Sequence, residues 1–317
     1  MAASYRYDLA NALVCDPVAA NRMASRNALF GMGFRNIEMI GSCDDLRQWL
    51  GDNDTDLLVI EASENIEEAC RVMQEIRQGK TGRNPFLIII ATTWQTSGEI
   101  VRGVVGAGAD DLLVRPFSVK QVADRIRTHV DARKGFVVTS DYIGPDRRRD
   151  SQRPSDAQLI AVPNSLKLRA AEGLPAQAAA VLAARAIEKS RSLVNLEKMR
   201  RSAFQIGVLA DFLKEAANTG ASPEMRRADV ERVRALNEEL ARRAAESGFE
   251  GLNDLCGTVT NVVKSVEEGK EQEKNAIVLS QLAIAMQVVL TPDRTDLDHE
   301  EELKRVLAKV RARGRAT

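Results

Sequence analysis

The stretch Gly108-Ala-Asp-Asp-Leu-Leu-Val-Arg-Pro-Phe117 decides the interpretation of the first half of the chain. Its apolar run Leu112–Val114 is long enough for a brief β-strand, and Arg115 and a proline follow it directly. We therefore expect a short strand whose carboxyl end carries a guanidinium group.

Four further strand-like runs precede this stretch, and segments with helical periodicity separate them. The runs are Ala12–Cys15, Asn36–Ile40, Leu57–Ile60 and Phe86–Ala91. The helical segments are Ala20–Met32, Ile66–Arg77, Gly98–Val105 and Val119–Val130. Nearly continuous Val, Ile and Leu strands that alternate with helices indicate a parallel sheet covered on both faces. The pattern predicts an α/β domain with the flavodoxin-like doubly wound fold, with five strands, over residues 1–135.

The alternation of strands and helices ends at Gly135, and two further regions follow. Residues 136–164 are rich in arginine and proline and predict a linker that begins with a short strand and docks on the first domain. Residues 165–317 predict an all-helical effector or interaction domain, either a bundle or an extended hairpin. Its longest helix carries an apolar seam of the coiled-coil type at Met199, Ala203, Ile206, Ala210 and Leu213.

The composition excludes several classes of protein. The chain has 45 basic and 45 acidic residues, so no net charge attracts nucleic acid or an anionic membrane. Its four cysteines form no CxxC pair, which argues against a zinc site and favours reduced thiols. The longest apolar stretch, Ala276–Leu290, is interrupted by polar residues, and we expect no membrane span and a cytoplasmic location. No nucleophile paired with a histidine base and no glycine-rich nucleotide loop is evident, so we expect no enzyme.

Over roughly residues 9–134 the chain resembles the CheY-like receiver domains of bacterial response regulators, which act in two-component signalling, a phosphorelay form of signal transduction. In that family two acids after the first strand and an aspartate after the third surround Mg²⁺, and the aspartate accepts the phosphoryl group. Asp16 matches the first acidic position, but Pro17 stands at the second and Glu61 at the phosphoacceptor. Arg115 replaces the family's lysine, and the hydroxyl position falls on Thr92 or Thr93. Leu112 stands at the aromatic switch position.

These departures imply a receiver that keeps the scaffold without the phosphate chemistry. Loss of one carboxylate weakens Mg²⁺ binding, so we expect no metal and no other cofactor. Glutamate extends one methylene further than aspartate and misplaces its carboxylate for in-line attack. Because arginine pairs with carboxylates as a planar fork, we expect Glu61 and Arg115 to form a permanent ion pair, with Thr92 or Thr93 bonded to the same carboxylate. This pocket defines a pseudo-receiver.

The sequence therefore predicts a degenerate, non-phosphorylated response regulator that works by protein–protein interaction. Its partners would be other signalling proteins, or a second copy of the chain bound through the receiver or the long helices. One alternative is a phosphorylatable regulator with a helical output domain. Another alternative is a nucleic-acid-binding regulator that uses the linker and the basic C-terminus, residues 304–315. The linker carries a cluster of basic residues that would contact an anion or a partner: Arg147, Arg148, Arg149 and Arg153.

Overall fold

A computed structural model describes residues 5–148, 159–170, 174–219 and 223–292, together with residues 298, 301, 303–305 and 308. Within the chain, two compact units are distinguished, Met1–Leu193 and Val194–Thr317. Each unit has its own core and is considered by itself.

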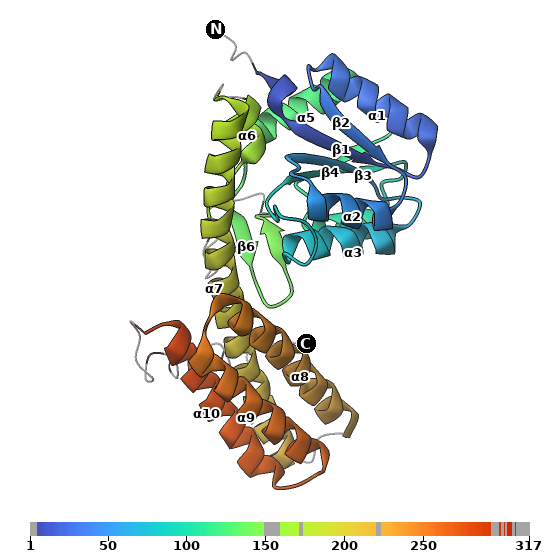
Figure 1. The fold of residues 1–317 in the computed structure, drawn as a ribbon. Helices are drawn as coiled ribbons and strands as arrows, with labels where there is room; N and C mark the ends of the chain where they lie inside the picture. Colours follow the sequence, from blue (N-terminus) through green and yellow to red (C-terminus); the bar gives the residue numbers. More distant parts are fainter. Residues whose placement is uncertain are drawn as a thin grey trace. The chain divides into compact units, whose positions relative to one another are not determined.

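The N-terminal unit contains the predicted parallel sheet. Its strands lie in the order β2-β1-β3-β4-β5, which is the order of the flavodoxin-like fold, and the fold prediction is confirmed (Figure 1). The strands are β1 (Asn11–Cys15), β2 (Asn36–Ile40), β3 (Leu57–Glu61), β4 (Ile88–Thr93) and β5 (Asp111–Val114). The helices between and after them are α1 (Ala19–Gly31), α2 (Cys43–Asp52), α3 (Ile66–Arg77), α4 (Gly98–Gly106) and α5 (Val119–Asp131).

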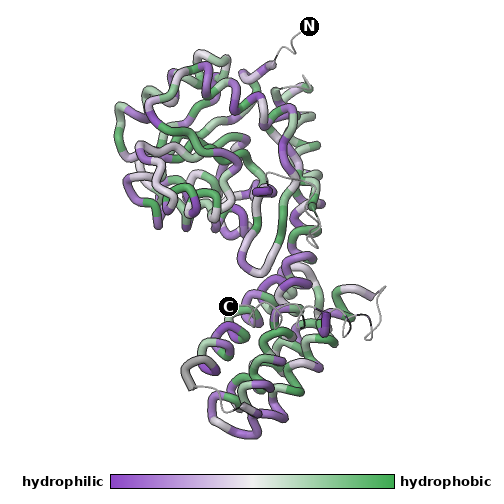
Figure 2. The backbone as a smooth tube through the Cα atoms, turned by 180° about the vertical axis from the view of Figure 1, so that it is seen from behind, coloured by the Kyte–Doolittle hydropathy of each residue, from purple (hydrophilic) through white to green (hydrophobic). Residues whose placement is uncertain are grey.

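Alternate residues of the strands serve two separate cores, one on each face of the sheet. Leu58 and Ile60 of β3 pack towards α2, α3 and α4, in a cluster with Val72 and Val104. Val59 and its neighbours face α1 and α5. The central strands are coloured as mostly hydrophobic in Figure 2, as expected when both faces are buried. Strand β4 begins and ends two residues later than predicted, and this brings both threonines into the sheet.

The described part of the linker folds back onto this unit. Strand β6 (Phe136–Val138) pairs antiparallel with β7 (Ile143–Pro145), and Ile160 exchanges two backbone hydrogen bonds with Phe136. The hairpin contacts α3, and a Cβ added at Gly144 would lie 2.9 Å from the Cα of Gly108. Because nothing larger fits there, the hairpin docks backbone against backbone.

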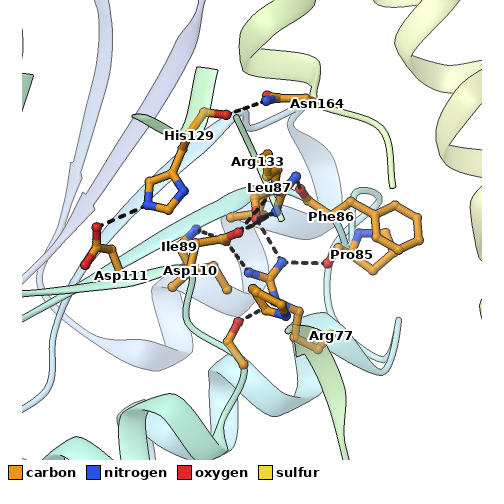
Figure 3. A network of polar contacts seen from close by, with 12 residues as sticks. Arg77, Pro85, Phe86, Leu87, Ile89, Asp110, Asp111, His129, Arg133 and Asn164 are labelled. Carbon is orange, nitrogen blue, oxygen red and sulfur yellow. Dashed lines mark hydrogen bonds and ion pairs between the residues drawn. The ribbon is translucent and has the colours of Figure 1, made fainter. Parts of the chain in front are cut away.

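A network of buried charges lies beneath this hairpin (Figure 3). Asp110 accepts from Arg77 Nη2 at 2.6 Å and from Arg133 Nη2 at 3.0 Å, and the three side chains are at most 5% exposed. The two guanidinium groups also donate to backbone carbonyls of the loop before β4, and Arg77 donates to Gly108 as well. Burial lowers the pKa of Arg77 to about 10, whereas the two arginines overcome the effect of burial and hold the pKa of Asp110 below its ordinary value. A single carboxylate thus pairs with two guanidinium groups at the end of the sheet.

The boundary between the units differs from the prediction at residue 165. Helix α6 (Ser165–Ala170) buries Leu166 and Ala170 in the core of the N-terminal unit. Arg169 of this helix pairs with Asp56, its Nε lying 3.0 Å from Oδ2, at the amino end of β3. Helix α7 (Ala176–Thr219) contributes its residues as far as Leu193 to the same unit. Periodicity predicts that this region is helical, but it does not reveal which hydrophobic core a helix packs against.

In the described part of the C-terminal unit the main elements are the rest of α7, α8 (Pro223–Ser247), α9 (Glu250–Glu267) and α10 (Gln272–Leu290). The predicted seam of α7 is buried in their common core, and hydrophobic and hydrophilic segments alternate along the helices (Figure 2). The predicted last helix, 300–310, lies mostly outside the described residues.

By length and composition α10 is apolar enough to cross a membrane, alone among the helices in the described part of the chain. It contributes Ala276, Leu279, Ala283, Met286 and Leu290 to the core of the C-terminal unit. Other apolar residues of the helix, Ile277 and Val289, are 38% and 40% exposed.

The substitution Asp110→Asn should strongly destabilise the N-terminal unit, since two buried guanidinium groups would lose their counter-charge. We expect a loss of about 3–5 kcal/mol in the free energy of unfolding. Urea unfolding followed by tryptophan fluorescence measures it, because both tryptophans, Trp49 and Trp94, lie in this unit. The matched control is Asp44→Asn, whose side chain is 94% exposed and pairs with Arg47, and which should cost less than about 1 kcal/mol. Equal losses for the two variants would contradict the role of the network.

Candidate functional site

The candidate site lies at the carboxyl edge of the sheet, where parallel strands end together. Asp16 follows β1, Glu61 ends β3, Thr92 lies opposite Glu61 in β4, and Arg115 follows β5. All four residues are less than 9% exposed. The parallel strands thus bring these four residues to one edge of the sheet.

One nitrogen of the Arg115 guanidinium group contacts three other side chains of the site. Its Nη2 donates to Asp16 Oδ2 at 3.1 Å, to Ser25 Oγ at 3.0 Å and to Thr92 Oγ1 at 3.4 Å. The guanidinium carbon lies 4.8 Å from the ring centroid of Phe117, within the range of a cation–π contact. Burial lowers the pKa of the Arg115 guanidinium, although Asp16 and Glu61 act against this effect.

Asp16 is the partner of Arg115, and its second oxygen is also occupied. Oδ1 accepts from the backbone N–H of Val18 at 2.9 Å, across Pro17. The Asp16 side chain is only 1% exposed, and burial raises its pKa even though Val18 and Arg115 favour the charged form. A buried carboxylate of this kind needs its guanidinium partner.

The predicted ion pair between Glu61 and Arg115 is wrong. Glu61 instead turns back onto the loop that follows β3: Oε1 accepts from Ser63 N at 2.8 Å and from the Ser63 hydroxyl, and Oε2 accepts from Glu64 N at 3.0 Å. The extra methylene of glutamate lets the carboxylate reach these nearby N–H groups, which satisfy it without Arg115. Asp16 is therefore the carboxylate that pairs with the Arg115 guanidinium group.

The two threonines of β4, Thr92 and Thr93, have different hydrogen-bond partners. Thr92 contacts Arg115, whereas the Thr93 hydroxyl donates to Gln95 O at 2.8 Å and accepts from Gln95 N at 3.1 Å. Thr92 is therefore the hydroxyl in the pocket, although it bonds the guanidinium and not the carboxylate of Glu61. Leu112, at the family's switch position, is partly buried against the α2–α3–α4 side of the sheet.

These residues do not suit Mg²⁺, the ion that the receiver fold implies. One Asp16 oxygen faces a guanidinium and the other an amide, Pro17 has no side-chain oxygen, and both oxygens of Glu61 accept backbone hydrogens. A hard divalent cation requires several free oxygen ligands. Across the described ranges, no group of three or more His, Cys, Asp or Glu residues has an arrangement able to hold a metal ion.

The linker arginines have partners within the N-terminal unit. Arg147 stacks on Tyr142, 3.5 Å from guanidinium carbon to ring centroid, and donates to Gly106 O. Arg148 pairs with Asp146. Arg149 and Arg153 lie outside the described residues. The two described arginines thus give no support to an exposed anion site.

Three contacts of the site were not foreseen from the sequence. Ser25 bonds Arg115, Phe117 stacks on it, and Ser63 bonds Glu61. Of these residues only Ser25 could have been found from the sequence. It lies three and four residues before Ala28 and Leu29, so it shares the buried face of α1 with them. A polar residue on an apolar helix face indicates a buried polar partner.

Known structures similar to this chain are receiver domains. A response regulator from Thermotoga maritima is 22% identical and covers 38% of this chain and 95% of its own, with a TM-score of 0.34. The chemotaxis protein CheY4 of Vibrio cholerae is 18% identical over 37% of this chain and 96% of its own, with a TM-score of 0.34. A CheY-like receiver domain protein from Methanospirillum hungatei is 16% identical over 38% of this chain and 94% of its own, with a TM-score of 0.35.

No family model and no curated protein matches the sequence. The likeness to the solved structures concerns the fold of the N-terminal unit alone, and the assignment of that fold rests on the observed strand order.

The substitution Arg115→Met should destabilise the N-terminal unit in a pH-dependent way. Near pH 8 the buried Asp16 carboxylate would have no counter-charge, and we expect a loss of about 3–5 kcal/mol in the free energy of unfolding. Burial already raises the folded-state pKa of Asp16 above its ordinary value of 3.8, and loss of Arg115 should raise it further. The folded state then binds the proton more tightly, so stability is regained as the pH falls through the raised pKa.

Urea unfolding followed by tryptophan fluorescence at pH 5 and pH 8 measures this difference. The double variant Asp16→Asn/Arg115→Met is the control, because without the carboxylate the added pH dependence should disappear. A pH dependence that persists in the double variant would contradict the pairing of Asp16 with Arg115.

Proposed function

We propose that this protein is a degenerate response regulator of the two-component type, which is not phosphorylated and acts by protein–protein interaction. The observation that carries the proposal is the Arg115 guanidinium, bonded within the site to Asp16, Ser25 and Thr92. Its bond to Asp16, together with the Val18 amide, occupies both oxygens of the carboxylate that a phosphorylatable receiver would offer to Mg²⁺. The protein would therefore present one fixed state of the receiver face.

The surroundings of Glu61 support the absence of phosphoryl transfer. A nucleophilic carboxylate needs a free oxygen directed at the incoming phosphorus atom, and positioning supplies most of the catalysis in such reactions. Both oxygens of Glu61 accept hydrogen bonds from the loop at Ser63 and Glu64. Attack would require these bonds to break without a bound metal to compensate for them. On this view the protein is not an enzyme and uses no cofactor.

Protein partners are favoured by the surface of the N-terminal unit. Three large apolar side chains of α1 and α5, Met23, Phe30 and Val119, are each 46–49% exposed. Because α1 and α5 pack against each other, these exposed apolar side chains are available to a protein partner. Another signalling protein is the partner we propose, with a second copy of the chain as the alternative. The four free cysteines suit the reducing cytoplasm in which we place the protein.

A phosphoryl analogue tests the proposal. Beryllofluoride with Mg²⁺ should leave the thermal unfolding midpoint of the N-terminal unit unchanged, as should a chelator, because neither ion has a site. Intrinsic tryptophan fluorescence reports the transition of this unit alone.

The matched control restores the receiver pattern in the triple variant Pro17→Asp/Glu61→Asp/Arg115→Lys. It should gain a Mg²⁺-dependent increase in Tm of about 2–4 °C for each kcal/mol by which the bound ion stabilises the folded state. A chelator-sensitive increase of similar size in the wild-type protein would refute the proposal. A response of the triple variant alone shows that the assay detects a working site and supports the proposal.

A further inference from the structure

Two cysteines line one pocket beside the candidate site. Cys15 and Cys43 both border a pocket of about 230 Å³ at the carboxyl edge of the sheet, together with Glu61. The remaining cysteines lie elsewhere: Cys70 faces Gly103 of α4, and Cys256 belongs to the core of the C-terminal unit. The chain thus has one pair of neighbouring thiols among its described residues.

The register of two strands brings these thiols together, although 28 positions separate them in the sequence. Cys15 is the last residue of β1 and lies opposite Ile40, the last residue of β2. Three residues later Cys43 begins α2, so the turn between β2 and α2 folds back over the end of β1. The Cys15 thiol donates to the carbonyl oxygen of Ser42 at 3.6 Å, directly beside Cys43.

The two thiols differ in their environments. Cys15 is 3% exposed, whereas Cys43 is partly exposed at the pocket wall. The neighbouring Cys15 thiol lowers the pKa of the Cys43 thiol, and this effect outweighs burial and the nearby charge of Glu68. The more accessible thiol is thus also the better source of thiolate, which is the reactive form.

The charge of the pocket selects the kind of oxidant. Its wall includes the acids Asp44, Glu61, Glu64 and Glu68, and none of its lining residues is basic. An anionic oxidant such as glutathione disulfide would be repelled, whereas hydrogen peroxide is small and neutral.

We propose that Cys43 and Cys15 form a peroxide-responsive redox site. The Cys43 thiolate attacks one oxygen of hydrogen peroxide, the O–O bond breaks, and the released hydroxide takes up a proton to leave as water. The Cys43 sulfenic acid is then attacked by the sulfur of Cys15, which gives up its proton. A second water leaves, and an intramolecular disulfide remains. Two thiols are oxidised and one peroxide is reduced to two waters.

The disulfide would join the carboxyl end of β1 to the start of α2, one residue before Asp16. It would limit movement of the loop at Gly41 and Ser42, which also lines the pocket. This activity goes beyond the proposed binding function and does not depend on it, because phosphoryl analogues and peroxide test different residues.

The test treats the full-length protein with hydrogen peroxide, blocks free thiols with an alkylating agent and maps the peptides by mass spectrometry. We expect a peptide pair linked through Cys15 and Cys43, with the loss of two hydrogens, that is recovered as free thiols after reduction. Cys43 should react about tenfold or more faster than Cys70. In Cys15→Ser, dimedone should trap the sulfenic acid on Cys43, because the resolving thiol is missing.

The variants Cys70→Ser and Cys256→Ser are matched controls and should form the same linked peptide as the wild type. A second set of reactions with glutathione disulfide should oxidise Cys43 more slowly than peroxide at equal concentration. Oxidation of Cys70 ahead of Cys43, or a Cys43 that oxidises without ever linking to Cys15, would overturn the proposal. Circular dichroism of each variant before treatment shows whether a lost reaction reflects a lost fold.

Discussion

The buried pair of Arg115 and Asp16 is the interaction on which the account of this protein depends. Both side chains are at most 5% exposed, so neither charge is stabilised by bulk water. A buried charge is tolerated only with a partner and further hydrogen bonds, and here Ser25, Thr92 and the Val18 amide provide them. Because the pair neutralises itself and both Asp16 oxygens have donors, Asp16 offers no free oxygen to a metal, which supports the proposed function.

Buried arginine–aspartate pairs also attach the segments that follow the sheet. Asp110 holds Arg77 and Arg133 below the linker hairpin, and Asp56 holds Arg169 of α6. Arg77, Arg133 and Arg115 also gain carbonyl, hydroxyl or aromatic contacts from their surroundings, which a lysine would satisfy less well. Replacement of the family's lysine by Arg115 therefore fits the way this unit uses arginine elsewhere.

The sequence predicts the sheet well and the contacts within the site less well. Apolar runs locate the strands, and parallel strands require Asp16, Glu61, Thr92 and Arg115 to share one edge. Strand order alone does not determine which carboxylate pairs with the Arg115 guanidinium. The loop amides of Ser63 and Glu64 bind the Glu61 carboxylate, so Arg115 pairs with Asp16. The boundary between the units is hard to predict for a similar reason. The helical pattern of α6 does not show which hydrophobic core the helix packs against. Cys15 and Cys43 likewise become neighbours only through the pairing of β1 with β2.

The side-chain resonances of Arg115 offer the most direct test of the central claim. In a protein labelled with ¹⁵N at arginine, the guanidinium signal that is lost in Arg115→Lys identifies this residue. If Asp16 and Arg115 form a permanent buried pair, that signal should exchange slowly with solvent and should not move when excess Mg²⁺ is added. A guanidinium signal that exchanges rapidly, or that shifts with a saturable dependence on Mg²⁺, would show that the site opens to a metal and would contradict the account.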